Sequence, residues 1–156
     1  MSLIEINQPA PDFTLEDVSG NPVSLSQFMG EKNVILVLNR GFVWPFCQKH
    51  MAQLRLDHKK FSEANTVVLV IGPESPDAYK AYFEKEQLPF VGLPDPSHKV
   101  LKLLGQKVKL FKLGRMPGQI IVDKQGNVRF IHYGHNMADI PVNEEVLALL
   151  QRINAE

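Results

Sequence analysis

Two short blocks of aliphatic residues constrain the fold of this chain more than any other feature. They are Val34–Leu38 and Thr66–Ile71, and neither contains a charged side chain. Consecutive apolar residues, in place of alternating ones, are typical of a strand that is buried on both faces of its sheet. Both blocks are therefore expected to be central strands of a sheet that other elements cover on both sides.

Helical patterns separate and follow these two strands. Apolar residues recur at helical spacing from Phe46 until the pattern fades at residues 62–65, and again from Asp77 to Glu86. Ser97 is a suitable N-cap for a further helix that ends at Gly105, and Asn143 is a suitable N-cap for the last one. The chain therefore supplies amphipathic helices that can cover a sheet.

Turn-forming residues indicate two hairpins. In the first, Ser19–Pro22 separates two alternating segments near the N-terminus, and a short helical turn follows it and ends at Gly30. In the second, residues 124–127 join strand 119–123 to strand 128–133. The second hairpin is the clearer of the two.

Two weaker strand signals complete the pattern. Phe90–Val91 lies between prolines and predicts a short edge strand. The alternation in Lys107–Leu113 is typical of an exposed edge that its lysines keep from pairing. The order of elements predicts an α/β fold, with a central mixed β-sheet flanked by helices on both faces and an N-terminal β-hairpin extension. We expect a single domain over residues 1–156.

Composition excludes several classes of protein. The chain has 156 residues, 44% of them hydrophobic, which is enough for one domain to bury a core without disulfides or a structural metal. Lysine plus arginine equals aspartate plus glutamate at 17 each, so no nucleic acid and no anionic membrane is expected as a partner. The single cysteine excludes an internal disulfide and a multi-cysteine metal site.

The N-terminal residues bear on location. Residues 1–7 lack a basic segment followed by an apolar one, and no apolar run approaches the ~18 residues of a spanning helix. A cytoplasmic protein is the expectation.

The single cysteine stands where a strand pattern gives way to a helix pattern. Cys47 follows the Val34–Leu38 block and falls in the first turn of the predicted helix. Unpaired backbone N–H groups and the helix dipole favour an anion at this position, and a cysteine there can have its pKa lowered from about 8.5 to roughly 3.5–7.5. Cys47 is therefore the candidate for chemistry.

Three motifs in order resemble the peroxiredoxins and redoxins, the alkyl hydroperoxide reductase and thiol-specific antioxidant (AhpC-TSA) group of the thioredoxin-like superfamily. The first is Ala10–Leu15 followed by Gly20–Leu25. The second is a strand that leads to Trp44–Cys47 at a helix start, and the third is Met116–Val128. The resemblance covers nearly the whole chain and implies a thioredoxin-like fold, in which Pro117 stands where the family usually places a cis-proline.

The chain departs from the usual motifs of this group around its cysteine. Arg40 and Trp44 occupy the proline and threonine positions of a Pro-x-x-x-Thr-x-x-Cys peroxiredoxin motif that ends at Cys47. Trp44 also occupies the first cysteine position of a Cys-Pro-Phe-Cys redoxin motif. Trp-Pro-Phe-Cys looks like such a redoxin that has lost its leading cysteine.

The resemblance implies an antioxidant oxidoreductase. Cys47 would attack a hydroperoxide and become a sulfenic acid. With no second cysteine, the reductant would be an external thiol such as glutathione, thioredoxin or a glutaredoxin, or the same cysteine of a second subunit in a homodimer. Arg40 and Arg115 would supply positive charge, and Met116 and Pro117 would contact the substrate through their backbone. No cofactor is implied.

Other residues of the motif have simpler interpretations. Trp44, with Pro45 and Phe46, is expected to line the pocket or to plug the core, because indole has no acid-base function. His50 lies on the same helical face as Cys47 and would raise its thiolate content if protonated, but a surface histidine is the simpler interpretation.

No metal site is expected, because His132 and His135 have no evident third ligand. A basic series without acidic residues is interpreted as a solvated face that can also attract an acidic partner or an anionic substrate. Its members are His98, Lys99, Lys102, Lys107, Lys109, Lys112 and Arg115.

Three functions remain open at this point. The first is a one-cysteine peroxiredoxin-like peroxidase that uses an external thiol. The second is a monothiol thioredoxin-like oxidoreductase that exchanges with mixed disulfides. The third is a redox-silent thioredoxin-fold binding protein in which Trp44 fills the former active site and Cys47 is a buried, inert side chain.

Overall fold

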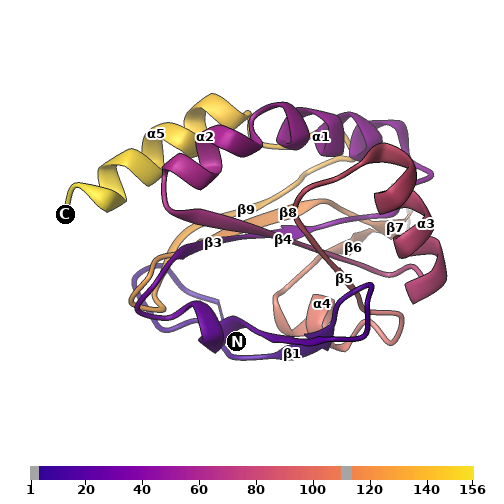
Figure 1. Ribbon diagram of the computed structural model, residues 1–156, viewed down its shortest axis with the longest axis horizontal. Helices are drawn as coiled ribbons and strands as arrows, with labels where there is room; N and C mark the ends of the chain where they lie inside the picture. The colour runs from indigo at the N-terminus through magenta and orange to yellow at the C-terminus, as the bar shows by residue number, and fades with distance from the viewer. Residues whose placement is uncertain (1–3, 110–113) are drawn as a thin grey trace.

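A five-stranded mixed sheet forms the centre of the protein in the computed structural model, which describes residues 4–109 and 114–156 (Figure 1). The strand order is β5-β4-β3-β8-β9. Strands β3 (Asn33–Leu38), β4 (Thr66–Gly72) and β5 (Val91–Pro94) are parallel to one another. Strand β8 (Gly118–Val122) pairs antiparallel with β3, and β9 (Val128–Tyr133) pairs antiparallel with β8. The predicted mixed sheet is confirmed.

Strand β3 is the centre of this sheet. All six of its residues are buried, and it pairs with β4 on one side and β8 on the other. Leu36, for example, lies opposite Leu69 of β4 and Ile120 of β8. Val34, Leu36 and Leu38 belong to the buried cluster on one face of the sheet, and Ile35 and Val37 to the cluster on the other face.

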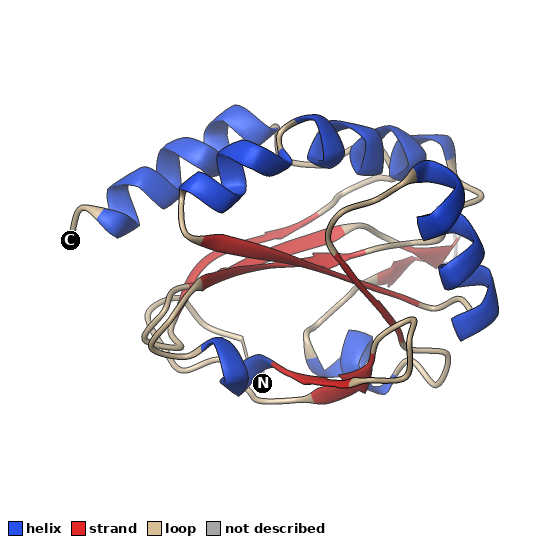
Figure 2. Ribbon diagram, in the orientation of Figure 1, coloured by secondary structure: helices blue, strands red, loops and turns tan. Residues whose placement is uncertain are grey.

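Four helices cover one face of the sheet (Figure 2). They are α1 (Pro45–Leu56), α2 (His58–Glu63), α3 (Pro76–Glu86) and α5 (Asn143–Asn154). Met51 and Leu54 of α1, Phe61 of α2 and Leu150 of α5 belong to one buried cluster with the sheet residue Ile35. The apolar stripe of each helix provides this contact.

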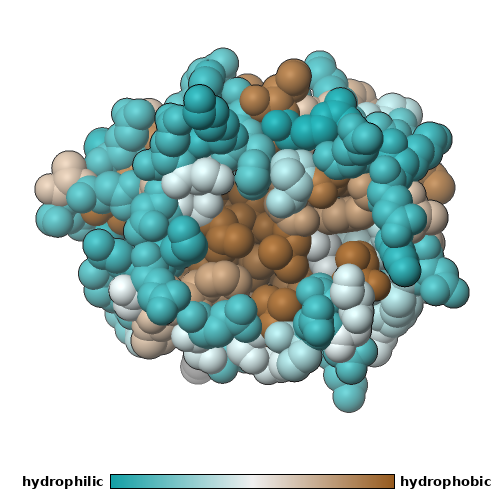
Figure 3. Space-filling view, viewed as in Figure 1, coloured by the Kyte–Doolittle hydropathy of each residue, from teal (hydrophilic) through white to brown (hydrophobic). Residues whose placement is uncertain are grey.

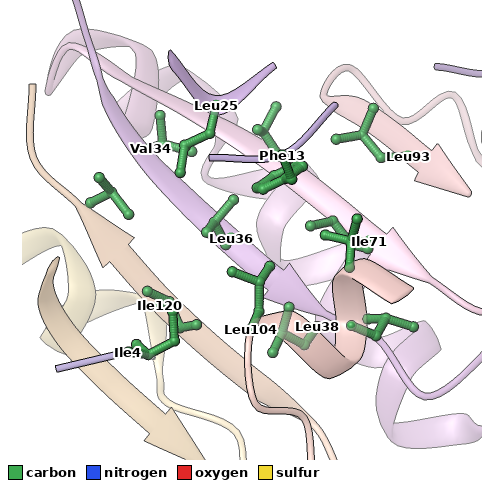
Figure 4. Close-up of a cluster of buried hydrophobic side chains, with 14 of the residues drawn as sticks. Ile4, Phe13, Leu25, Val34, Leu36, Leu38, Ile71, Leu93, Leu104 and Ile120 are labelled. Carbon is green, nitrogen blue, oxygen red and sulfur yellow. The ribbon is translucent and has the colours of Figure 1, made fainter. Parts of the chain in front are cut away.

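The N-terminal hairpin and α4 cover the opposite face. The hairpin consists of β1 (Thr14–Glu16) and β2 (Pro22–Ser24), and the 3₁₀ turn η1 (Leu25–Phe28) follows it. Helix α4 (Lys99–Leu103) and the short pair β6 (Val108–Lys109) and β7 (Gly114–Arg115) complete this side. Figure 4 shows Phe13, Leu25 and Leu104 against Leu36 and Ile120 of the sheet. The predicted hairpin extension and the helices on both faces are confirmed.

The predicted helix after Cys47 is interrupted. It divides at Asp57, whose backbone (φ −99°, ψ 7°) leaves the helical region. The side-chain Nδ2 of Asn143 donates hydrogen bonds to the Gln53 carbonyl (3.1 Å) and to Asp57 Oδ2 (2.9 Å) at this break. Asn143 therefore joins α5 to the break between α1 and α2 and does not act as the predicted N-cap, a position that Val142 occupies.

Two other boundaries differ from expectation. His98, and not Ser97, is the N-cap of α4, with a left-handed backbone (φ 64°). Of the predicted strand Lys107–Leu113, Val108–Lys109 is a strand, whereas residues 110–113 lie outside the described residues.

The surface that is turned toward the viewer in Figure 3 is mixed in polarity. Figure 3 shows an apolar area at its centre with hydrophilic residues around it, between the helices and the N-terminal hairpin. Within residues 4–109 and 114–156, no helix combines the length and the apolar character needed to cross a membrane.

Two leucines of α1 test the packing of this helix. Leu54 is 0% exposed, whereas Leu56, two residues later, is 79% exposed. We expect Leu54→Ala to lower the free energy of unfolding by about 2–5 kcal/mol, because it removes a core side chain and leaves a cavity. Urea denaturation measures this change.

Leu56→Ala is the matched control, and its effect should stay within about 0.5 kcal/mol. Equal losses in the two variants would contradict the packing of α1 on the sheet.

Candidate active site

The site lies where the ends of several strands meet. Parallel strands end at the same edge of a sheet, and ligands of open α/β sheets bind beyond that edge. Arg40 follows β3 and Glu74 follows β4 at this edge. Antiparallel strand β8 begins there, with Met116 and Pro117 just before it. The sheet therefore brings distant segments to the start of α1.

Cys47 is the third residue of α1. Trp44 is the N-cap and Pro45 the first helical residue, where a proline costs no hydrogen bond. Cys47 is only 2% exposed. The predicted first-turn position is confirmed, and the thiol is buried there.

Burial decides the ionisation of this cysteine. It raises the pKa of the Cys47 thiol above the ordinary value, although the backbone N–H groups of Arg40 and Gly41 and the charge of Arg40 lower it, and the charge of Glu74 raises it further. The expected lowering of the pKa is therefore wrong for this conformation. The free-energy cost of removing a thiolate from water is larger than the stabilisation that the helix N-terminus and the Arg40 guanidinium provide.

The Arg40 side chain has unused hydrogen-bonding capacity at the site. It is 4% exposed, its Nε donates to the Arg115 carbonyl at 2.5 Å, and its guanidinium lies 4.4 Å from the centre of the Trp44 ring. Both terminal nitrogens are buried and have no hydrogen-bond partner within the described part of the chain. Buried donors without partners are costly, so this geometry favours a ligand with acceptor oxygens.

Trp44 lies beside Arg40 and the Gly41 backbone. Gly41 has a φ of 143°, and a Cβ built there would lie 3.4 Å from Trp44 Cδ1 and 3.5 Å from Glu74 Oε2. A side chain would therefore crowd both neighbours. Trp44 is half-buried, and its ring lies against the Arg40 guanidinium.

Glu74 is the site residue that sequence reasoning missed. Its Oε2 accepts a hydrogen bond from the Phe42 backbone N–H at 2.5 Å, and its Oε1 is buried without a partner in the described chain. Burial raises the pKa of this carboxyl above its ordinary value, against the lowering effect of the backbone hydrogen bonds. The available signal was a carboxylate two residues after the strand that neighbours the cysteine's own strand.

Arg115 reaches the site through its backbone. Its carbonyl accepts from Arg40, but its side chain donates to Gln106 Oε1 (3.0 Å) and contacts His98 Nδ1 (2.9 Å). Gln106 in turn donates to the Asn39 and Met116 carbonyls at 3.1 and 3.0 Å. The Arg115 guanidinium therefore braces this edge of the sheet and is not directed at the thiol by these bonds.

The loop before β8 is compact and buried. Met116 is 0% exposed, and Pro117 lines a small cavity together with Cys47. No cis peptide bond occurs among the described residues. The cis-proline that the resemblance implied before Pro117 is therefore not seen.

His50 is buried, contrary to the surface position that seemed simpler. Cys47, His50, Met51 and Leu54 share the buried face of α1, at i, i+3, i+4 and i+7 spacing. Burial lowers the pKa of His50 from 6.5 to about 4, so its ring is neutral at neutral pH. The expectation that it would promote the thiolate as a cation is wrong, because the same burial removes its charge.

Pro45 and Phe46 lie on the outside of the first turn. Pro45 is exposed and Phe46 is 41% exposed. Phe46 borders a surface groove with Ile140 and Val142. Neither residue lines the small cavity beside Cys47.

The two candidate metal histidines have other partners. His132 Nε2 lies 2.9 Å from Asp139 Oδ1, and the His135 backbone N–H donates to Asp139 Oδ2 at 2.9 Å. The His135 bond, and then that of His132, lowers the pKa of Asp139. In residues 4–109 and 114–156, no three histidine, cysteine or acidic side chains are grouped as a metal site requires.

The basic series lies mostly in solvent. His98, Lys99, Lys102 and Lys107 are exposed, as a solvated face predicts, whereas Lys112 lies outside the described residues. Arg115 is half-buried against Gln106.

With this geometry established, comparison with known proteins identifies the family. The AhpC/TSA family profile matches residues 6–131, most of the chain. The chain belongs to the AhpC/TSA family. This AhpC/TSA protein is 35% identical over 145 residues to the chloroplastic peroxiredoxin Q of Sedum lineare, covering 92% of this chain and 76% of that one. It is 34% identical over 148 residues to the chloroplastic peroxiredoxin Q of Populus jackii, covering 94% and 68%.

Solved structures confirm the thioredoxin-like fold of this AhpC/TSA protein. Peroxidoxin BcpB from Mycobacterium tuberculosis superposes with a TM-score of 0.83 over 96% of this chain and 98% of its own, at 21% identity. The reduced 2-Cys peroxiredoxin of Plasmodium vivax gives a TM-score of 0.84 over 96% and 82%, also at 21% identity.

The comparison also corrects the expected location. The similar peroxiredoxins Q are named as chloroplastic proteins, which contradicts the prediction of a cytoplasmic protein. That prediction relied on the composition of seven N-terminal residues, which is weaker evidence than similarity across most of the chain.

The buried His50 predicts a loss of stability in acid. Its pKa is about 4 in the folded protein and 6.5 when free, so the unfolded chain binds its proton first as the pH falls. Neutral His50 contributes roughly 3 kcal/mol to the free energy of unfolding. This contribution is complete above pH ~6.5 and is lost by pH ~4. We expect His50→Gln to show a smaller decrease over this range than the wild type in urea denaturation.

His58→Gln, which replaces a partly exposed histidine next to α1, is the control and should keep the full decrease. An identical pH dependence in wild type and His50→Gln would rule out burial of a neutral ring.

The Cys47 thiol should titrate above the range of an ordinary cysteine. Its alkylation rate with iodoacetamide, measured against pH, should show a midpoint that reflects the raised pKa. Arg40→Met should raise the pKa further, because the charge that favours the thiolate is removed.

Arg55→Met, on the exposed side of α1, is the control for this change and should leave the midpoint in place. A wild-type midpoint at or below that of an ordinary cysteine would show that desolvation does not dominate.

Proposed function

We propose that this protein is a one-cysteine peroxidase in which Cys47 reduces hydroperoxides at the expense of an external thiol. Its membership of the AhpC/TSA family and its similarity to peroxiredoxins Q support thiol-dependent antioxidant activity. The observation that carries the assignment of the site is the position of the single cysteine beside a buried arginine with two free nitrogens.

The chemistry is a displacement at oxygen. The Cys47 thiolate attacks the terminal oxygen of R–O–OH, an S–O bond forms, and the O–O bond breaks. Sulfur is oxidised to the sulfenic acid and the peroxide is reduced to an alcohol or to water, once its leaving oxygen gains a proton.

Arg40 is suited to hold the peroxide. Its free N–H groups can donate to the peroxide oxygens, and its charge stabilises both the thiolate and the negative charge that develops on the leaving oxygen. The Arg115 carbonyl and the Trp44 ring hold the guanidinium in place. In this proposal Arg40 takes the role of the threonine hydroxyl of the usual peroxiredoxin motif, which this chain lacks.

An external thiol completes the cycle. The sulfenic acid condenses with R′SH to give a mixed disulfide and water, and a second R′SH releases the Cys47 thiol and R′SSR′. Thioredoxin, a glutaredoxin or glutathione can act as this thiol. In a homodimer, the Cys47 of a second subunit is an alternative partner.

The burial of Cys47 favours a second candidate. A 2% exposed thiol with a raised pKa is also what a redox-silent binding protein or a slow monothiol oxidoreductase would have. Reactivity with peroxide separates these functions. The thiol of a redox-silent protein does not react with peroxide. A monothiol oxidoreductase forms mixed disulfides but does not react with peroxide.

A peroxide challenge tests the proposal. Reduced protein is mixed with hydrogen peroxide at neutral pH, a dione reagent traps sulfenic acid, and intact mass gives the extent of labelling. We expect one label per chain, a rate that rises with pH as the thiol ionises, and at least a ~10-fold lower rate in Arg40→Met, since an electrostatic donor is lost.

Cys47→Ser should show no label, and the exposed-site variant Arg55→Met should react like the wild type. A folded wild type that stays unlabelled would exclude the peroxidase and leave the redox-silent binding protein or the monothiol oxidoreductase.

A further inference from the structure

A small cavity lies between α1 and the sheet, next to the thiol. Cys47 and His50 of α1 line it, and so do Val37 of β3 and Gln119 of β8. Val37 pairs with Gln119 across the two strands, so both side chains project from the face that α1 covers. The thiol therefore borders an internal space on its sheet side.

Three side chains around this cavity have polar atoms without partners. Asn39 is 2% exposed, His50 6% and Gln119 1%, and all three line the cavity. Asn39 Nδ2, His50 Nε2 and both polar atoms of the Gln119 amide are buried and have no hydrogen-bond partner within residues 4–109 and 114–156. Because unpaired buried polar groups are costly, this arrangement favours a polar occupant.

The size and the chemistry of the cavity select a water molecule. The cavity offers about 10 Å³ to the centre of a water, which is about the room that one buried water needs. Asn39 Nδ2 and Gln119 Nε2 are donors, Gln119 Oε1 is an acceptor, and His50 Nε2 is either one according to the tautomer of its ring. A buried water makes roughly two to four hydrogen bonds with such groups. One water is thus the occupant whose size and hydrogen bonds both fit.

His50 also borders the surface. It lines the groove that Phe46 and Val142 border, as well as the cavity. Ile140 and Pro141 line both spaces too, but their side chains have no polar atom. Among the described residues, His50 is therefore the polar side chain that stands between the cavity and the groove.

Few other titratable groups face His50 and the cavity. They are Cys47 and Lys49 on its own helix, His132 on β9, and Asp139 in the loop before α5. His132 Nε2 lies 2.9 Å from Asp139 Oδ1, so these two side chains are engaged with each other. The charges of Arg40 and Glu74 act on the thiol. His50 differs from His132 in that its Nε2 is buried without a partner in the described chain.

We propose that this cavity binds one water molecule between Cys47 and His50, and that the thiol proton leaves through this water to His50 and then to the groove. Asn39 and Gln119 are positioning residues, because they hold the water. The inference goes beyond the peroxidase proposed above, since it concerns how the thiol ionises, whatever the thiolate then attacks.

The transfer balances in protons and charge. Cys47–SH gives its proton to the water oxygen as the same water gives a proton to His50 Nε2, which leaves a thiolate, a water and an imidazolium. The imidazolium then releases a proton from its other ring nitrogen to solvent in the groove. The sum is a thiolate and a hydrated proton, and no bond between heavy atoms forms or breaks.

The environment of His50 suits a carrier of the proton and not a store. Burial lowers the pKa of His50 to about 4, so at neutral pH the ring passes on a proton that it receives. Arg40 does not line the cavity. The proton therefore leaves without passing the guanidinium that is proposed to hold the peroxide.

The water is tested in the wild type. In ¹⁵N-labelled protein, NMR should show dipolar cross-peaks between water and the side-chain amide protons of Asn39 and Gln119, with the sign of a long-lived bound water. The exposed amide of Gln125 is the control, because surface waters leave too fast to give this sign. Missing cross-peaks at both buried amides would show a dry cavity and overturn the inference. This measurement does not depend on a variant that folds.

The proton path is tested by hydrogen exchange of the thiol itself. Cys47 is the single cysteine of the chain, so the S–H stretching band of the infrared spectrum belongs to it alone. After transfer to heavy water, loss of this band should be at least ~10-fold slower in Gln119→Leu, because without the water the thiol exchanges only by local opening. A similar slowing is expected in His50→Gln, whose amide can bond to the water but cannot carry a proton through.

Matched variants and a second readout control for structural damage. Gln125→Leu and His58→Gln make the same changes away from the cavity and should exchange like the wild type. Backbone amide exchange of α1 should be equal in all these proteins, because the path requires no opening of the helix. His50→Gln should keep the water cross-peak of Asn39, whereas Gln119→Leu should lose it.

The outcomes separate this inference from the peroxidase. Unchanged S–H exchange in Gln119→Leu and His50→Gln would overturn the path, and slowing in Gln119→Leu alone would exclude His50 as the carrier. A change of S–H and amide exchange by the same factor would also overturn the path, since the thiol would then exchange by opening of α1. None of these measurements uses peroxide. A wild type that exchanges through the cavity but never forms sulfenic acid would overturn the peroxidase and leave this inference in place.

Discussion

The pairing of β3 with a strand on each side is the constraint on which the site depends. Because β3 pairs with β4 and β8 at once, the segments that follow β3 and β4 and the segment that precedes β8 must meet at one edge. Cys47, Glu74 and the Arg115 carbonyl are therefore brought together by strand pairing and not by proximity in the chain. The Arg40 bond to Arg115 ties this edge across the sheet.

Two opposing effects set the pKa of the Cys47 thiol. A helix start and a nearby guanidinium favour the thiolate, but a dry position penalises any charge that is not compensated. At Cys47 the penalty is larger. The folded protein thus favours the protonated form of the Cys47 thiol. Such an arrangement favours a cysteine that ionises when a substrate is present over one that is ionised at all times.

Much of the architecture could be predicted because it follows local patterns. The consecutive apolar residues of β3 and β4 and the turn residues of both hairpins carry their own signals, and so does the first-turn position of Cys47. The break at Asp57 could not be predicted, because it involves Asn143, 86 residues away. Glu74 was missed for a related reason, since only the pairing of β4 with β3 brings it to the loop that leads to Cys47. His50 was different: its spacing from Cys47, Met51 and Leu54 already placed it on the apolar face, and a histidine's polarity was given too much weight.

The contact between Trp44 and Arg40 allows tryptophan fluorescence to report on the site. Trp44 is the single tryptophan of the chain, and its ring lies against the guanidinium next to the reactive sulfur. Indole fluorescence responds to nearby charge and to exposure. With excitation at wavelengths that tyrosines do not absorb, the emission therefore comes from Trp44 alone and reports on this site. Oxidation of the thiol and its reduction by a donor can be followed as an optical signal in the unlabelled protein.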